Sequence, residues 1–346
     1  MVKLVQRIED LRFQIGEYVA TEIEKLGFTV QLDPSTGLEA FFKVYAGDST
    51  AGEWHIYTEG WIFGAIIQFD DGQPNFFYNG DFGSDVWGHY TPPPSLTVPC
   101  VALERAEYTT LDERSALLEA CTNAGVRDAV RVFLVATKDV SLAHTSVSDA
   151  IFAVDAAFNN WWTLKAAIKG GVTGGTLRVG QPIHTVSGWN NVGGFTWVYE
   201  EYQRKLFSDE AVPTHPHTGT STPFRADYVV DTVGPDGKFS VPTDAQVWNS
   251  TAMAFENAGS GVEAASKVTY TFKFGNWHHG QAMTMDDIRW SMAEFFRIVQ
   301  STGDLNPESP SLAAAPGFEF VNDLFRGAKF YEGNDTVEVW FDFWNP

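Results

Sequence analysis

Apolar and polar residues follow helix and strand spacings in turn over the first sixty positions. A helix is predicted between Asp10, a candidate N-cap, and Gly27. Its apolar residues recur every three or four positions, at Ile15, Val19, Ile23 and Leu26. Alternation predicts strands at 28–32 and 54–58, with a short helix at 38–45 between them. Because helices and strands take turns along the chain, we predict an α/β fold with parallel strand pairing.

The regular pattern is lost between residues 62 and 99, where Gly, Pro, Asn and aromatic residues dominate. A loop of this length usually has a function or wraps over a neighbour, and we expect a long irregular loop here. Further on, Thr110 and Glu113 have the spacing of a capping box, which predicts the start of a helix. Alternation over 130–134 predicts a strand, and residues 158–168 favour another helix.

A glycine-rich segment, residues 170–175, divides the chain into two predicted domains. Residues 1–170 form the first, an α/β lobe. Residues 171–346 form the second, which has more strand patterns and turn signals. The second domain is expected to open with a strand at 176–179.

The clearest element pair of the second domain is a strand followed by a helix. The strand pattern covers 267–274, and the helix begins at Thr284. Thr284 and Asp287 resemble a capping box in which Asp replaces the usual Glu. The apolar face of this helix consists of Ile288, Met292, Phe295, Phe296 and Val299.

The composition of the chain limits the classes of partner that it can bind. The chain has 346 residues, and its 44 acidic against 23 basic residues give a net charge of −21. This charge repels phosphates, so nucleic acids and anionic membrane surfaces are disfavoured. No apolar stretch reaches the roughly 18 residues of a membrane-spanning helix.

The two ends of the sequence bear on localisation. The N-terminal residues lack the apolar core and small-residue cleavage site of a signal peptide. The last ten residues, VEVWFDFWNP, stop inside an alternating pattern, so we expect the chain to be a fragment of a longer protein. An export signal and a membrane anchor would then lie outside this chain.

Candidate metal and disulfide residues are few. Cys100 and Cys121 are the two cysteines, and the sequence leaves both a disulfide and two unpaired thiols open. The histidine groups 215–217 and 278–279 lack the partner spacing of a zinc site, so we interpret them as loop histidines. We therefore predict no metal and no cofactor.

No catalytic motif stands out either. The adjacent acids at 70–71, 200–201 and 286–287 point in different directions on a helix or strand, so none is by itself a glycosidase pair. We interpret them as solvated or helix-capping acids, with 286–287 in the first turn of a helix. Neither a phosphate-binding glycine loop nor a nucleophile elbow occurs.

Aromatic residues are the strongest candidates for ligand contacts. The chain has 12 Trp, 11 Tyr and 27 Phe. Trp61 follows Gly60 at a predicted strand end, where α/β folds place ligands. Trp189 and Trp197 lie in a glycine-rich loop, where they either line a ligand cleft or cover the edge of a lobe. We predict a ligand site of Trp61, Trp189 and Trp197, with Asp70 as a polar contact.

The segment 267–292 carries a resemblance to a known family. Its ordered features are Tyr270-Thr271-Phe272, Gly275, Trp277-His278, Gly280, Thr284 and Asp287-Ile288. This pattern resembles the signature of the extracellular solute-binding proteins of family 5, the oligopeptide- and dipeptide-binding components of ABC importers. Residues 7–61, which end in Gly60-Trp61, are similar to a lobe segment of the same proteins.

The resemblance implies a fold and a function. The fold would be the two-lobed, type II periplasmic-binding-protein architecture, with mixed sheets flanked by helices. The activity would be non-covalent capture of a peptide at the cell surface or in the periplasm, with the membrane permease of the importer as partner. Residues 1–170 would correspond to the C-terminal-side lobe and residues 171–346 to a truncated signature-bearing lobe.

Two departures from the family pattern widen the ligand class. The Tyr-Thr-Phe signature follows the other lobe here, whereas it usually precedes it. Peptide-binding members also carry an Asp three residues beyond Gly-Trp, where this chain has Gly64. Another small polar solute, such as a sugar, is therefore an alternative ligand. The alternative functions are a glycan-active hydrolase that uses cleft carboxylates and a surface module without a pocket.

Overall fold

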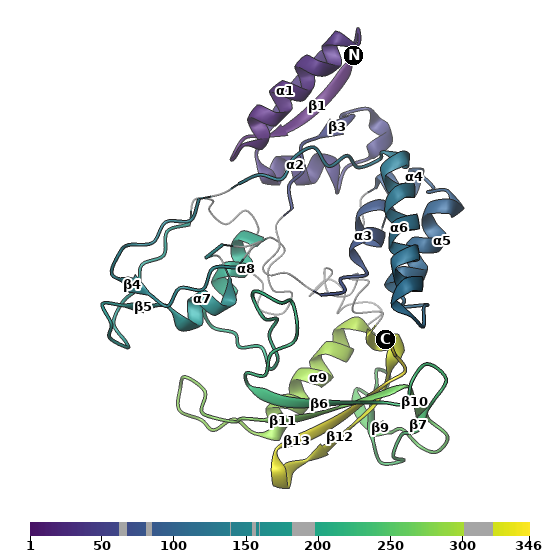
Figure 1. The fold of residues 1–346 in the computed structure, drawn as a ribbon, viewed down its shortest axis with the longest axis vertical. Coiled ribbons are helices and arrows are strands. Elements are labelled where there is room, and N and C mark those ends of the chain that lie inside the picture. The colour runs from purple at the N-terminus through teal and green to yellow at the C-terminus, as the bar shows by residue number, and fades with distance from the viewer. Residues whose placement is uncertain are drawn as a thin grey trace.

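The fold belongs to the α/β class, as predicted. The computed structural model describes residues 1–61, 68–80, 85–138, 140–153, 157–158, 160–181, 198–300 and 321–346. Figure 1 shows a small sheet near the N-terminus and a larger one near the C-terminus, at opposite ends of the molecule. No helix in the described ranges is long and apolar enough to cross a membrane.

The N-terminal sheet is parallel, which confirms the predicted pairing. Its strands are β1 (Val2–Arg7), β2 (Val30–Ser35) and β3 (Ile56–Tyr57), in the order β2-β1-β3. The connecting helices are α1 (Arg12–Lys25) and α2 (Gly37–Val44), close to their predicted positions. The apolar pattern did not predict β1, because Val5 and Gln6 interrupt the alternation that Val2, Lys3 and Leu4 begin.

The central strand β1 is covered on both faces. Leu4 and Gln6 lie beneath α1, where a side chain in place of Gly16 would stand 2.8 Å from Cβ of Gln6. Val5 points the other way and packs with Ala40 of α2. One helix therefore lies on each face, as expected when a chain returns from β2 across β1 to β3.

Four helices follow, three of which begin within the segment expected to be an irregular loop. They are α3 (Gln73–Tyr78), α4 (Val86–His89), α5 (Pro94–Glu104) and α6 (Leu111–Asp128). The expectation of a loop over 62–99 was therefore wrong for its described part. Prolines were the misleading signal, since both α3 and α5 carry Pro in the first turn, where a missing N–H costs no hydrogen bond. The predicted capping box of α6 is confirmed, with Thr110 and Glu113 bonded reciprocally.

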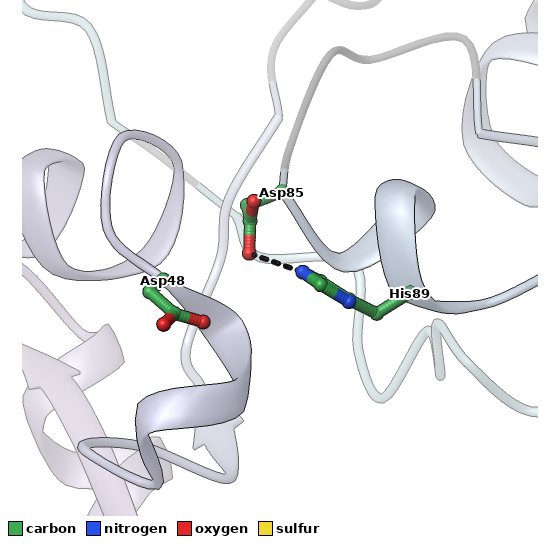
Figure 2. A group of neighbouring side chains, drawn as sticks. All are labelled: Asp48, Asp85 and His89. Atoms are coloured by element: carbon green, nitrogen blue, oxygen red, sulfur yellow. Dashed lines mark ion pairs between the residues drawn. The ribbon is translucent and has the colours of Figure 1, made fainter.

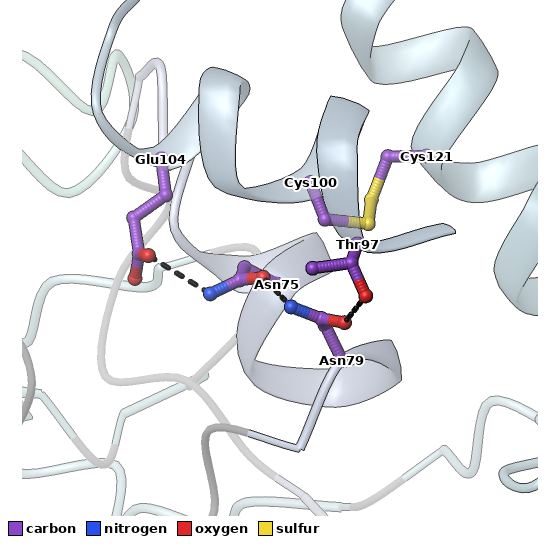
Figure 3. The surroundings of a disulfide bond; sticks show 6 residues. All are labelled: Asn75, Asn79, Thr97, Cys100, Glu104 and Cys121. Atoms are coloured by element: carbon purple, nitrogen blue, oxygen red, sulfur yellow. Dashed lines mark hydrogen bonds between the residues drawn. A yellow bond between two sulfur atoms is a disulfide. The ribbon is translucent and has the colours of Figure 1, made fainter. Parts of the chain in front are cut away.

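A disulfide joins two of these helices and settles the question left open by the sequence. Cys100 of α5 and Cys121 of α6 are bonded and fully buried. Figure 3 shows a chain of side-chain hydrogen bonds beside the bridge, from Thr97 through Asn79 and Asn75 to Glu104, each 2.8 Å long. The bridge and this polar chain fix α5 against both α6 and α3.

The middle of the chain contains short elements. They are β4 (Val147–Ser148), α7 (Trp161–Ala166), β5 (Ile168–Lys169) and α8 (Val198–Arg204). The helix predicted over 158–168 is confirmed by α7, but the strands predicted at 130–134 and 176–179 are not formed. Their apolar side chains, such as Phe133 and Val179, are exposed. Alternation alone did not make strands because no neighbouring strand pairs with these segments.

The C-terminal half is built around a six-stranded sheet in the order β6-β11-β13-β12-β8-β9, with antiparallel neighbours. The strands are β6 (Ala226–Thr232), β8 (Gln246–Asn249), β9 (Ala254–Asn257), β11 (Ser266–Phe272), β12 (Phe325–Tyr331) and β13 (Thr336–Phe341). A separate ribbon pairs β7 (Phe239–Ser240) with β10 (Glu263–Ala264). Short 3-10 turns are η1 (Ser49–Ala51) and η2 (Glu332–Asn334).

Helix α9 (Met285–Val299) packs on one face of this sheet (Figure 1). Met285, Ile288 and Met292 meet the buried Val337 and Val339 of β13. The backbone N–H of Thr284 donates to Asp287 Oδ2 over 2.7 Å, which confirms the predicted helix start. The structure therefore bears out the strand–helix pair, while the division into domains 1–170 and 171–346 stays a prediction.

Candidate functional site

The candidate site lies where the parallel strands of the N-terminal sheet reach their carboxyl ends. Open α/β sheets bind ligands at this edge, because the loops after the strands gather there. Trp61 stands four residues beyond Tyr57, the last residue of β3. Its side chain is 40% exposed, so a large part of the indole faces solvent. Trp61 is thus an accessible tryptophan close to a strand end, and its role in ligand binding stays a prediction.

A group of aromatic rings supports Trp61. The rings of Phe76 and Phe77, both on α3, meet the indole edge-on with centroids 5.2 Å away. Phe133 packs edge-on against Phe77 at 5.4 Å. Edge-on packing holds each ring by contact with its neighbour and leaves an outer face open. We call Trp61, Phe76, Phe77 and Phe133 the aromatic platform.

An ion pair borders the aromatic platform. Glu59 Oε2 lies 3.0 Å from Arg131 Nε, and the Tyr45 hydroxyl donates to Glu59 Oε1. Arg131 also donates through Nη1 to the backbone oxygen of Phe77 over 2.9 Å, and its guanidinium lies 5.3 Å from the centre of the Phe77 ring. Burial, with the adjacent Glu59 charge, raises the pKa of Tyr45, so this hydroxyl remains a donor at neutral pH. Charge is thus fixed beside the rings in a defined orientation.

The carboxyl end of β1 carries a second fixed ion pair. Arg7 is almost fully buried and donates from Nε to Glu9 Oε2 over 2.7 Å. Glu9 Oε1 accepts the backbone N–H of Gly37 at the start of α2, over 2.5 Å. A side chain at Gly37 would come within 2.6 Å of Arg7 Nη2, so this close approach requires glycine. Burial opposes ionisation of Glu9, but the Arg7 and Gly37 hydrogen bonds outweigh it and lower its pKa.

Arg12 links this edge to a distant part of the chain. Its guanidinium forms an ion pair with Asp10 and donates from Nη2 to the hydroxyl of Tyr199, on α8, over 3.2 Å. Burial alone would lower the pKa of Arg12, but its bonds to Asp10 raise it, so the guanidinium is charged. The site edge is therefore joined to α8, directly after the segment that holds Trp189 and Trp197.

Asp70 lies near the start of α3, the helix that carries Phe76 and Phe77 of the aromatic platform. It stands three residues before Gln73, the first residue of α3, whereas Trp61 contacts Phe76 and Phe77 in the second half of that helix. Burial raises the pKa of the Asp70 carboxyl, and the neighbouring Asp71 charge adds to the rise against the hydrogen bond of Gln73. The structure therefore brings Trp61 and Asp70 to the two ends of the same helix. Trp189 and Trp197 lie outside the described residues.

The interpretation of the adjacent acids as solvated is wrong for Asp71. Its side chain is 10% exposed and accepts two hydrogen bonds from Nε of Arg114, at 2.9 and 3.0 Å. The Tyr108 hydroxyl donates to Asp71 Oδ2 over 2.6 Å. Burial and this hydrogen bond raise the pKa of Tyr108 to about 12. Asp71 thus anchors the start of α3 to α6 rather than facing water.

Sequence reasoning missed Glu59 and Arg131. Glu59 precedes the Gly60-Trp61 pair, so the strand-end rule that selected Trp61 also pointed to it. Arg131 had no such signal, because it stands 72 positions further along the chain and meets Glu59 only through folding. The predicted strand at 130–134 also assigned Arg131 to the wrong surroundings.

Donors for a metal ion gather elsewhere. In the described part of the chain, three such side chains come within reach of one another at one place, Asp48, Asp85 and His89. Ser49–Ala51 adjoins the amino end of β1, where Lys3 Nζ donates to the backbone oxygen of Gly52 over 2.9 Å. This cluster is therefore at the opposite end of the sheet from Trp61.

A pocket also lies on the C-terminal sheet. It is an open, mainly apolar pocket of about 340 Å³ beside β6, β11 and β13, and Phe341, Phe343 and Trp344 contribute its rings. It does not include Trp61 or Asp70, so it is separate from the predicted ligand site.

Comparison with known proteins does not indicate which of these surfaces, at Trp61, at Asp48 or on the C-terminal sheet, binds a ligand. No protein-family model matches the sequence, and the search of curated proteins finds no match.

Proposed function

We propose that this chain is the extracellular solute-binding component of an ABC importer, in which two α/β lobes of the type II periplasmic-binding-protein architecture close on a peptide or another small polar solute. The observation that carries the proposal is the aromatic platform at the carboxyl ends of parallel strands. An exposed indole supplies apolar contact area, and the adjacent Glu59–Arg131 pair supplies fixed polar groups. The membrane permease of the importer would receive the closed, loaded form.

The strand–turn–helix unit of β11 and α9 supports the family assignment. The Tyr270-Thr271-Phe272 motif lies on β11, and Thr284 with Asp287 begins α9. These are the elements on which the solute-binding signature is expected. The motif residues Tyr270 and Phe272 pack against the buried cluster beneath α9, which gives them a structural role in that lobe.

The disulfide supports an extracellular location. Disulfides persist in oxidising compartments and are rare in the cytosol. Cys100 and Cys121 are buried and bonded in this protein. An exported receptor fits that chemistry.

Glycan hydrolysis is the competing function, and the acids near the platform decide how it is tested. Glu59 and Asp71 each form an ion pair with an arginine, so both carboxylates already have a partner within the fold. Asp70, with its raised pKa, is the acid that a hydrolase would use. Binding without turnover supports the receptor, and turnover that is lost in D70N supports the hydrolase.

The proposal is tested by titrating the whole chain with peptide and oligosaccharide libraries, following tryptophan fluorescence and then calorimetry for each hit. W61A should weaken binding of the identified solute by about tenfold or more, because aromatic anchors dominate ligand contacts. W290A is the control, since Trp290 is exposed and lies on α9, which packs on the C-terminal sheet. Unchanged affinity in W61A, or the absence of any binding by the folded wild-type chain, would contradict the proposal.

A further inference from the structure

Three metal-type donors from two separate segments meet outside the site described above. Asp48 is the N-cap of η1, Asp85 directly precedes α4, and His89 ends that helix. Figure 2 shows His89 facing Asp85, with Asp48 beside them. One ligand atom from each residue lies within 4.8 Å of the others, although Asp48 is 37 positions from Asp85.

Hydrogen bonds orient both carboxylates. The backbone N–H and the hydroxyl of Ser49 donate to Asp85 Oδ2 over 2.7 and 2.8 Å. Thr50 holds Asp48 Oδ1 in the same way, over 2.8 and 2.6 Å. A carboxylate has about four lone-pair sites. These bonds therefore fix each group and leave acceptor capacity for a cation, as partners around a metal site commonly do.

The cluster has an excess of negative charge. Among the described residues neither carboxylate has an ion pair with Lys or Arg. His89 Nε2 lies 3.5 Å from Asp85 Oδ2. A divalent cation would neutralise the two charges that this cluster leaves uncompensated.

We propose that Asp48, Asp85 and His89 bind a zinc-class divalent ion that ties η1 to α4. One imidazole nitrogen with carboxylate oxygens is a donor set that Zn²⁺ accepts, whereas Ca²⁺ and Mg²⁺ take oxygen donors. Three protein ligands leave a further coordination position, which the exposure of His89 opens to water. The ion would join η1, near the amino end of the parallel sheet, to α4, which precedes the disulfide-bonded helix α5 in the chain.

Calorimetric titration of the intact chain with ZnCl₂ tests the proposal, with Co²⁺ absorption as a report on the ligands. H89A and D85N should each weaken Zn²⁺ binding by about tenfold or more. H144A is the matched control, because His144 is an exposed histidine bonded only to Ser146 in its own turn, and it should bind Zn²⁺ as the wild type does. Zn²⁺ should also raise the Tm of the wild type and not that of H89A.

Three results would overturn the assignment. The first is no saturable Zn²⁺ binding by the wild type up to millimolar concentration. The second is wild-type affinity in both H89A and D85N. The third is Ca²⁺ binding that depends on Asp85 and not on His89, which would make the site an oxygen-only calcium site. Circular dichroism of each variant excludes loss of folding as the cause, and solute binding at Trp61 is measured separately, so the two proposals fail independently.

Discussion

Asp70 and Asp71 are neighbours in the sequence and differ in almost every physical respect. Asp71 is buried against Arg114 and Tyr108, whereas Asp70 is half-buried and has a glutamine as its side-chain partner. The sequence shows two identical acids, and the difference arises from α6, which begins 40 residues later. Adjacent carboxylates therefore make opposite contributions to stability.

We expect D71N to be strongly destabilising. The substitution keeps the shape of the side chain but leaves the guanidinium of Arg114, which is 16% exposed, without its anion. Removing one partner of a buried pair costs about 3 kcal/mol of unfolding free energy. Urea unfolding at neutral pH measures the loss. A change below about 1 kcal/mol would show that this ion pair is screened like a surface pair.

D70N, in contrast to D71N, should stabilise the protein. The pKa of Asp70 is raised in the folded state, so its ionised form costs stability above the folded pKa, and the cost vanishes below the unfolded value near 3.9. D70N should raise the unfolding free energy at pH 7, by less than about 1 kcal/mol because the carboxyl is partly exposed. The difference from wild type should disappear below about pH 4. Destabilisation at pH 7 would contradict the raised pKa.

At this scale the sequence could predict single residues better than their partners. Trp61 was found because a local rule, the carboxyl end of a strand, applied to it. Arg131 and Arg114 were not found, because their partners Glu59 and Asp71 lie 72 and 43 positions away. Long-range ion pairs leave no periodic signal in one sequence.

Helices and strands were predictable to the extent that their ends carry local chemistry. The capping boxes at Thr110 and Thr284 marked α6 and α9 correctly, because both partners lie within one turn. The strands expected at 130–134 and 176–179 failed because a strand needs a partner that its own residues do not encode. Helices α3 and α5 were not predicted, because their prolines are common both in loops and in the first turn of a helix.

The Cys100–Cys121 bridge should contribute a large part of the stability of the α5–α6 pair. The bond closes a loop of 21 positions, and a loop of this size restricts the unfolded chain by about 3 kcal/mol in the chain-entropy model. The double variant C100A/C121A should lose about that amount in denaturant unfolding. Dithiothreitol should destabilise the wild type and leave the double variant unchanged. Equal stability of oxidised wild type and double variant would contradict this role.

The whole molecule has its hydrophobic clusters in separate places. Val5, Ala40 and Val44 form one cluster in the N-terminal unit, and a second surrounds the disulfide. The C-terminal sheet has its own clusters on its two faces. The hydrogen bond from Arg12 to Tyr199 joins the N-terminal unit to α8. Such an organisation is compatible with lobes that move relative to one another, as the proposed receptor requires.

The net charge of −21 leads to a prediction for the whole chain at neutral pH. Salt screens both attraction and repulsion, but exposed ion pairs are worth at most about 1 kcal/mol each, and the acids outnumber the bases almost two to one. Repulsion should therefore dominate, and Tm should rise as NaCl is raised from about 0.05 to 1 M, over which the Debye length falls to about 3 Å.

Differential scanning calorimetry at pH 7 and at about pH 5 gives the comparison. At the lower pH, protonation of histidines and of some carboxylates reduces the net charge, so the salt response should be weaker. D71N at pH 7 provides an internal reference, because it removes one of the 44 acids and one attractive pair together. If Tm falls with salt at pH 7, the attractive ion pairs outweigh the repulsion among the excess acids, and the prediction is wrong.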